Sequence, residues 1–320
     1  DIIQTLAQQL NLTAEQVGKT VQLIDEGNTI PFIARYRKEV TGSLDDSVLR
    51  TLDEKLTALR NLAQRKQEVQ DLIGAQGKLT EEVRAAIERA ATVTEVDDIY
   101  RPFRPKRKTR ASVARERGLE DLAILLFAQE KSYTPSIEEQ AARFVDPERE
   151  VPDVAAALQG AMDIVAEEVS DNADYRRELR RLTFDAGSLT SKAAKEEDSV
   201  YAMYYDFSEP LRKLPGHRIL AINRGEKEEF LKVALTVPED VVLGYLYNRV
   251  LSGNRSPAEP YVREAVTDAY NRLIAPSIER EIRNDLFDTA CEGAIKVFSD
   301  NLGHLLMQPP LKGKVVLGFD

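Results

Sequence analysis

The chain has 320 residues, of which 42% are hydrophobic and 31% are charged, and its formal net charge is −10. These values predict a folded protein with one large or two ordinary domains. The overall acidity argues against a protein that binds nucleic acid over its whole surface, so any such site must be local. A single Cys, at position 291, excludes a disulfide within the chain, and no apolar run approaches the roughly 20 residues that a membrane helix needs. Together these features predict a cytoplasmic protein without a membrane contact.

The first hundred residues predict helices. Thr13 and Gln16 fit a capping box, and the first helices loosely fit a helix-turn-helix-like unit. The segment 45–73 contains no Gly or Pro, and its apolar residues recur in steps of three and four. This spacing predicts a helix about 43 Å long, which Gly74 and Gly77 end.

The segment 101–117, RPFRPKRKTRASVARER, is strongly basic within an acidic chain. Its two prolines are expected to keep it extended, so that the cations form a row. The row can hold phosphates while Tyr100 and Phe103 stack on bases. Alternatively, the acidic helices that the segment crosses neutralise it, and both interpretations stay open. The candidate phosphate ligands are Arg104, Lys106, Arg107, Lys108 and Arg110.

Two smaller basic clusters could likewise either contact a partner or form part of an ordinary protein surface. Arg176, Arg177, Arg180 and Arg181 have the spacing of one helix face, with Glu178 off that face. A salt-bridged face is the favoured interpretation, and Arg176, Arg177 and Arg180 are kept as candidates for phosphate contact. For the cluster 35–38, a solvated helix end is favoured over a second interaction patch.

The rest of the chain predicts more helices, with two exceptions. HRILAINR and FLKVALTV flank Gly225 and Glu226, which predicts a β-hairpin over 217–237. The tail KVVLGFD predicts a strand. The predicted fold is therefore mainly α, a multi-helix bundle with long helices and a small hairpin. Its domains are a helical domain (1–184), a central region with the hairpin and returning long helices (185–310), and a last strand (311–320) that begins an α/β domain.

The tail strand ends at Asp320 without a partner strand in the sequence, so we expect the natural protein to continue. A strand that ends in Asp is typical of nucleases of the ribonuclease H type, where this carboxylate holds a divalent metal. One carboxylate does not make a metal site, so we expect no catalysis within the chain. Cys291 and two His residues do not suggest a nucleophile or a zinc site, and no cofactor motif is present.

Five stretches, in order along nearly the whole chain, resemble the Tex family of bacterial transcription accessory proteins. They are GNTIPFIARYRKEVTGSLDD (27–46), DDIYRPFRPKRKTRASVARERGLEDLA (97–123), YYDFSEPL (204–211), HRILAINRGEKEEFLKVAL (217–235) and VVLGFD (315–320). The resemblance implies a longer protein that continues with an RNase H-like (YqgF-type) domain, helix-hairpin-helix elements and an OB-fold that carries most of the nucleic-acid affinity. It also implies that the RNase H-like domain retains little of a complete active site.

The sequence therefore predicts a non-catalytic helical scaffold of a transcription accessory protein. We expect it to bind nucleic acid, with RNA favoured, and to contact RNA polymerase. One alternative is part of a metal-dependent nuclease whose first metal-binding acid is Asp320. The other is a scaffold that contacts proteins alone.

Overall fold

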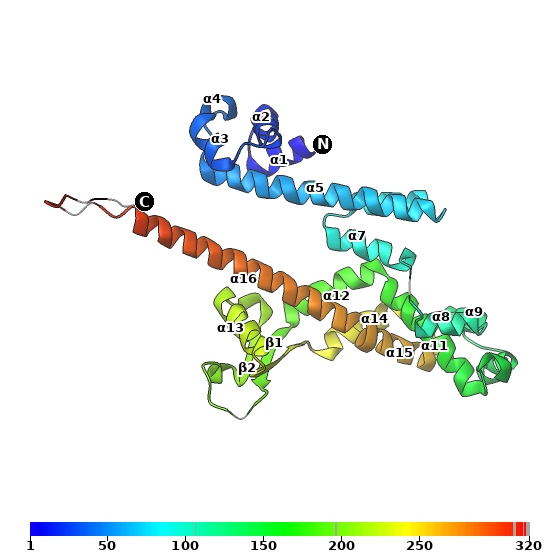
Figure 1. Ribbon diagram of the computed structural model, residues 1–320. Coiled ribbons are helices and arrows are strands. Elements are labelled where there is room, and N and C mark those ends of the chain that lie inside the picture. Colours follow the sequence, from blue (N-terminus) through cyan, green and yellow to red (C-terminus); the bar gives the residue numbers. More distant parts are fainter. Residues whose placement is uncertain (106, 196, 310–311, 316, 318–320) are drawn as a thin grey trace. The chain divides into compact units, whose positions relative to one another are not determined.

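The computed structural model describes residues 1–105, 107–195, 197–309, 312–315 and 317. The chain divides into two compact units, Asp1–Pro105 and Lys106–Asp320, whose elements are traced in Figure 1. The sequence instead placed a boundary between 184 and 185, which lies in the last turn of a helix inside the second unit. As predicted, the described chain is mainly α-helical, and its small sheet is antiparallel.

The first unit is built from helices around the long helix α5. Their bounds are α1 (Ile2–Leu10), α2 (Ala14–Asp25), α3 (Ile30–Tyr36), α4 (Lys38–Thr41), α5 (Asp46–Ala75), α6 (Glu81–Arg89), α7 (Val93–Tyr100) and the 3-10 turn η1 (Arg101–Phe103). The predicted capping box of Thr13 and Gln16 is present at the start of α2. The predicted long helix is confirmed as α5, where the Asp45 side chain accepts from the backbone N–H of Val48.

Helix α5 contributes to three separate apolar clusters along its length. Leu52 and Leu56 pack with α1 and α2, while Leu49 packs with α3. Further along, Val69 and Ile73 pack with α6 and α7. Because successive groups of short helices use successive turns of α5, this helix holds the first unit together.

The second unit has other helices packed around α11, which is largely buried. Its α-helices are α8 (Arg110–Glu116), α9 (Glu120–Ala128), α10 (Ile137–Ala141), α11 (Val154–Asp171), α12 (Ala173–Ala186), α13 (Gly216–Lys227), α14 (Glu239–Val250), α15 (Glu259–Asp268) and α16 (Ala275–Leu306). Shorter turns lie at η2 (Ala142–Phe144), η3 (Pro147–Arg149), η4 (Ala202–Tyr204) and η5 (Leu211–Lys213). Helix α11 packs against α8, α9 and α15. Gly160 permits the close approach, since a Cβ there would lie 2.3 Å from Cδ1 of Leu119.

The sheet of the second unit corrects the predicted hairpin over 217–237. Its strands are β1 (Ser188–Ala193), β2 (Asp206–Pro210) and β3 (Leu231–Thr236), in the order β2-β1-β3 with antiparallel pairs. The segment HRILAINR is helix α13, and β3 pairs with β1. Gly225 is not a hairpin turn but a site of close packing in α13, where a Cβ would lie 2.7 Å from Leu231.

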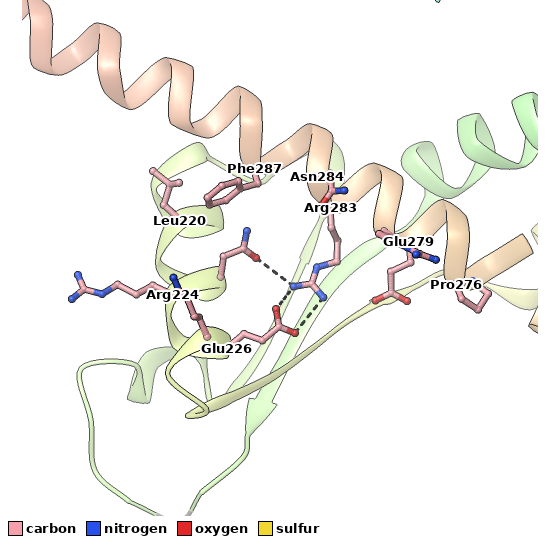
Figure 2. Close-up of a pocket in the computed structure, with 11 residues that line it drawn as sticks. Leu220, Arg224, Glu226, Pro276, Glu279, Arg283, Asn284 and Phe287 are labelled. Carbon is pink, nitrogen blue, oxygen red and sulfur yellow. Dashed lines mark hydrogen bonds and ion pairs between the residues drawn. The ribbon is translucent and has the colours of Figure 1, made fainter. Parts of the chain in front are cut away.

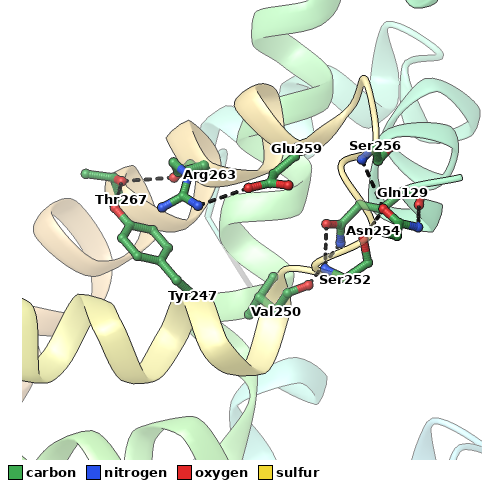
Figure 3. A network of polar contacts seen from close by, with 9 residues as sticks. All are labelled: Gln129, Tyr247, Val250, Ser252, Asn254, Ser256, Glu259, Arg263 and Thr267. Atoms are coloured by element: carbon green, nitrogen blue, oxygen red, sulfur yellow. Dashed lines mark hydrogen bonds and ion pairs between the residues drawn. The ribbon is translucent and has the colours of Figure 1, made fainter. Parts of the chain in front are cut away.

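A polar network closes the loop between α14 and α15 (Figure 3). The buried Gln129, just after α9, donates from Nε2 to the carbonyl of Val250 at 2.9 Å. Its Oε1 accepts from the backbone N–H of Ser252 at 3.0 Å, and its own carbonyl accepts from Nδ2 of Asn254 at 2.8 Å. These three contacts engage both ends of the amide and the backbone, so they account for the burial of this polar side chain.

The chain is helical without interruption from α15 into α16. The joining segment η6 (Ala269–Ile274) is a π-helix, and Pro276 lies in the first turn of α16, where it does not break the helix. The second half of α16 is exposed and carries apolar side chains, including Phe298 and Leu302. No described helix has the length and apolar character required to cross a membrane.

The structure describes only part of the tail that was predicted to form a strand. The described residues Lys314, Val315 and Leu317 are not in a strand. Position 316 and positions 318–320, with the candidate metal ligand Asp320, lie outside the described residues.

Candidate nucleic-acid interface

The basic segment 101–117 is extended only in part, at Arg104 and in the described non-helical residues up to Thr109, rather than over the whole row that its prolines predict. Pro102 lies in the 3-10 turn η1, and the segment from Arg110 onward forms α8. The Thr109 side chain caps α8 by accepting from the backbone N–H of Ser112. The segment also joins the two units, with Arg104 in the first and Arg107 in the second.

Some cations of this segment are neutralised within the fold. In the first unit, Arg104 lies 3.7 Å from Asp97 and 5.5 Å above the Tyr100 ring. In the second unit, Arg115 donates to the carboxylate of Glu167 at 2.6 Å. The same carboxylate, on the buried helix α11, accepts from the Thr109 hydroxyl at 3.1 Å. The pair and the hydroxyl therefore fasten α8 to α11.

Three cations of the second unit are different. Arg107, Lys108 and Arg110 are exposed, and none of them forms an ion pair with a carboxylate in the described part of the chain. Lys106, which the sequence places in the same group, lies outside the described residues. The two sequence interpretations thus apply to different residues. Arg115 is paired with an acid, whereas these three cations are exposed, and of the three Arg110 acts on the carboxylate of Asp163 through its charge.

The arginines of α12 do not form one accessible face. Arg176 is fully buried and bonds to the carbonyl of Ser170 and to the Ser277 hydroxyl. Its guanidinium lies 3.6 Å from Glu281, and Arg180 lies 2.8 Å from the same carboxylate. This charged contact joins α12 to α16, so the structure does not present Arg176 to an external phosphate.

The outer arginines of α12 are paired with acids of the same helix. Arg177 lies 2.8 Å from Asp174, and Arg181 lies 2.6 Å from Glu178 and 2.8 Å from Asp185. The expectation that Glu178 lies away from the arginines is wrong, because it contacts Arg181 at a spacing of three residues. Exposed pairs of this kind contribute little to stability.

The contact between α12 and α16 makes the second unit sensitive to acid. Burial acts to raise the pKa of Glu281, but the Arg180 hydrogen bond and charge hold it below its ordinary value of 4.5. A lowered pKa in the folded state contributes stability above the ordinary pKa, and that stability is lost as the pH falls through the folded value. We therefore expect the unfolding free energy to drop below about pH 4.5, and Glu281→Gln to remove part of this drop, measured by urea unfolding at several pH values.

Asp163 provides a control of opposite sign. Burial raises the pKa of Asp163 above its ordinary value of 3.8, so its protonation favours the folded state as the pH falls. Asp163→Asn should therefore steepen the loss of stability in acid. Equal slopes for the two variants would contradict the assignment to Glu281.

A groove of about 640 Å³ lies between α13 and α16 (Figure 2). Leu220 and Phe287 form its apolar end, whereas Arg283 bonds to Glu226 and Asn223. Four cations and two acids line the groove, and two of the cations are paired, Arg224 with Glu228 and Arg283 with Glu226. Cys291 is half-buried, and no group of three or more potential metal-ligating side chains occurs among the described residues.

Glu167 is the contact that sequence reasoning missed. Spacing predicts an apolar face of α11 through Leu158, Met162, Val165 and Val169, and Glu167 lies on the other side of the helix. It is buried because α11 is surrounded by helices. No local pattern in the sequence marks this acid as a partner for Thr109 and Arg115.

Comparisons with known proteins assign the chain to a family. The model described as "Tex-like protein N-terminal domain" matches residues 1–74, and the model "Tex central region-like" matches residues 132–298. "Protein tex" of Bordetella pertussis is 38% identical over 335 residues, which cover 100% of this chain and 42% of that protein. "Transcriptional accessory protein Tex" of Neisseria gonorrhoeae is 36% identical over 328 residues, covering 100% and 43%.

A human relative extends the comparison beyond bacteria. "S1 RNA-binding domain-containing protein 1" of Homo sapiens is 30% identical over 336 residues, which cover 100% of this chain and 33% of that protein. The chain thus spans less than half the length of these relatives. Both units contribute to the family matches, and the chain belongs to the Tex family.

Proposed function

We propose that the chain is the helical scaffold of a transcription accessory protein and that its second unit contacts nucleic acid, with RNA favoured, through Arg107, Lys108 and Arg110. Two relatives support the class of ligand by name, one as a transcriptional accessory protein and one as an S1 RNA-binding domain-containing protein. The scaffold is proposed to be non-catalytic, and the chain's relatives are more than twice its length, so other parts of the protein share in its activity.

The observation that carries this proposal is the exposure of these three cations and the lack of a described ion pair to any of them. They are exposed and form no ion pair among the described residues, in a chain whose net charge is −10. Within the described ranges no ion pair uses them, although the charge of Arg110 acts on the carboxylate of Asp163. A phosphate backbone supplies anions at close spacing, and each neutralised phosphate releases a counterion.

The test is the triple variant Arg107→Gln, Lys108→Gln, Arg110→Gln of the 320-residue chain, titrated with a fluorescent single-stranded RNA at several salt concentrations. Each lost phosphate contact lowers the slope of log affinity against log salt by about 0.7, so three contacts lower it by about 2. At about 0.1 M salt the affinity should then fall by roughly 100-fold. The same titration with single-stranded and duplex DNA determines the preferred nucleic acid.

A matched control removes three cations that are already paired. Arg50, Arg60 and Arg224 lie 2.6–3.0 Å from Asp46, Asp25 and Glu228 respectively. Replacing these three with Gln changes the net charge equally and should leave the salt slope unchanged. Equal losses in the two variants would mean a general charge effect and would overturn the assigned contact.

Contact with RNA polymerase is part of the same proposal, supported by the accessory role named for the gonococcal relative. The competing interpretation is a scaffold that contacts proteins alone. A complex with polymerase that survives nuclease treatment, together with an unchanged salt slope in the triple variant, would favour that interpretation. The nuclease alternative depends on Asp320, which lies outside the described residues.

A further inference from the structure

The first unit carries an exposed basic–aromatic patch at the junction of α3 and α4. The patch consists of Phe32, Arg35, Tyr36, Arg37 and Lys38. Tyr36 is 55% exposed, which is unusual for a large ring among the helices of this unit. The favoured sequence interpretation, a solvated helix end, accounts for the charges but not for the exposed ring.

Helix α3 is held by its other side. Ile33 is fully buried, and Ile30 and Ala34 pack with it against a cluster that includes Leu23 and Leu49. At about 100° per residue, Phe32, Arg35 and Tyr36 then point away from that cluster. The core of the first unit therefore fixes the orientation of the patch without using its rings.

The rings and guanidinium groups of the patch lie against one another, with the two rings tilted by 48°. Phe32 and Tyr36, one turn apart, have ring centroids 5.3 Å apart. The Arg37 guanidinium lies 5.1 Å above the Phe32 ring, and that of Arg35 lies 6.0 Å above the Tyr36 ring. Arg37 also donates to the backbone carbonyl of Tyr36 at 3.0 Å, which fixes its position. The result is a preformed surface of π-faces and flat cations.

The charge of the patch is not compensated by the fold. Arg35, Arg37 and Lys38 form no ion pair with a carboxylate among the described residues of the first unit. Elsewhere in this unit, Arg60 is paired with Asp25 and Arg65 with Asp97. The dipole of α3 favours a cation at its C-terminal end, but this effect is small and falls off within one turn.

We propose that the basic–aromatic patch is a second nucleic-acid site, which binds a single strand by stacking a base on Tyr36 and holding phosphates with Arg35 and Lys38. Stacking requires an exposed aromatic face and is tolerant of base identity, while flanking cations follow the backbone. An acidic peptide would use the cations but would leave the ring faces unused. The combination of both features on one surface favours a single-stranded nucleic acid.

The chain contains no Trp, so Tyr36→Trp places a unique indole in the patch. Titration of this variant of the 320-residue chain with single-stranded oligo-U or oligo-dT should quench the indole fluorescence in a saturable manner. Because the reporter is local, it detects occupation of the patch whether or not the strand also binds elsewhere. Poly-Glu of similar length is the probe for an acidic peptide, and equal quenching by it would overturn the proposal.

Substitutions separate stacking from charge. Tyr36→Ala should weaken the binding of a single strand by roughly 5- to 100-fold, whereas Tyr36→Phe keeps the ring and should retain affinity. The cations are tested by adding Arg35→Gln and Lys38→Gln to the Tyr36→Trp variant and following its indole fluorescence. The salt slope should fall by about 1.4, and the affinity at about 0.1 M salt should fall by roughly 20-fold. Lys78 and Arg89 are exposed cations of the same unit, and their replacement by Gln should change neither quantity.

This inference and the proposed function fail in different ways. Indole quenching in the Tyr36→Trp variant that persists when the Arg107/Lys108/Arg110 triple substitution is added supports the patch as a site of its own. Absence of quenching, while the triple substitution still weakens RNA binding, overturns the patch and leaves the proposed function standing. Absence of quenching together with an unchanged salt slope in the triple variant overturns both.

Discussion

Replacing Arg176 with alanine is expected to lower the unfolding free energy of the second unit by about 3–5 kcal/mol. The side chain is fully buried and bonds to Ser170 and Ser277 while lying 3.6 Å from Glu281. Its removal leaves the Ser170 carbonyl and the Ser277 hydroxyl without the guanidinium and opens a cavity in place of a large buried side chain, while Glu281 keeps its contact with Arg180 at 2.8 Å. Urea unfolding followed by circular dichroism measures the loss.

Two further variants identify the source of this effect. Arg177→Ala removes an exposed arginine from the same helix, one paired with Asp174, and should change the stability little. Arg176→Met keeps most of the buried volume, so its difference from Arg176→Ala reports the cavity, and the remainder reports the lost charge. If Arg176→Ala and Arg177→Ala have similar effects, the buried contact does not join α12 to α16 as described.

Glu167→Ala is expected to destabilise the second unit by about 2–4 kcal/mol. Its carboxylate accepts from Arg115 at 2.6 Å and from Thr109 at 3.1 Å, and it is only 8% exposed. The loss deprives α8 of its polar attachment to α11. Thermal unfolding of Glu167→Ala, Arg115→Met and the double variant gives the coupling energy between the two residues.

The same variants distinguish attachment from nucleic-acid contact. Below its melting temperature, Arg115→Met should bind single-stranded RNA with an unchanged salt slope, because Arg115 is engaged with Glu167. The Arg107/Lys108/Arg110 triple variant should show the reverse, with weaker binding and nearly unchanged stability. A lower salt slope in Arg115→Met would show that the paired arginine also contacts the strand.

The sequence predicted the fold best where local signals are strong. The apolar spacing of 45–73 and the capping box at Thr13 belong to the elements themselves, so they were sufficient to predict α5 and α2. The hairpin over 217–237 failed because Gly225 has two possible uses. A glycine that permits close packing of a helix against Leu231 cannot be distinguished, in one sequence, from a glycine in a turn.

The candidate site was predicted only in part, for a related reason. Composition showed that 101–117 is basic, but the partner of Arg115 lies 52 residues further along the chain. Likewise, helical spacing grouped Arg176 with Arg177, although Arg176 faces Ser277, 101 residues away, and Arg177 faces its own helix. Spacing defines the direction of a side chain, whereas its partner depends on the tertiary packing.

The π-helical segment between α15 and α16 determines in which directions the side chains of α16 point relative to those of α15. Successive side chains of an α-helix are about 100° apart around its axis. A hydrogen-bonded π-turn contains one more residue than an α-turn, so it shifts the directions of all later side chains. Helix α15 can thus face α9, α11 and α14, while α16, on the same continuous helix, faces α12 and α13. An unbroken α-helix of the same residues would rotate Ser277 and Glu281 away from Arg176. The additional residue in the π-turn therefore lets one continuous helix bury its α15 part against one group of helices and its α16 part against another.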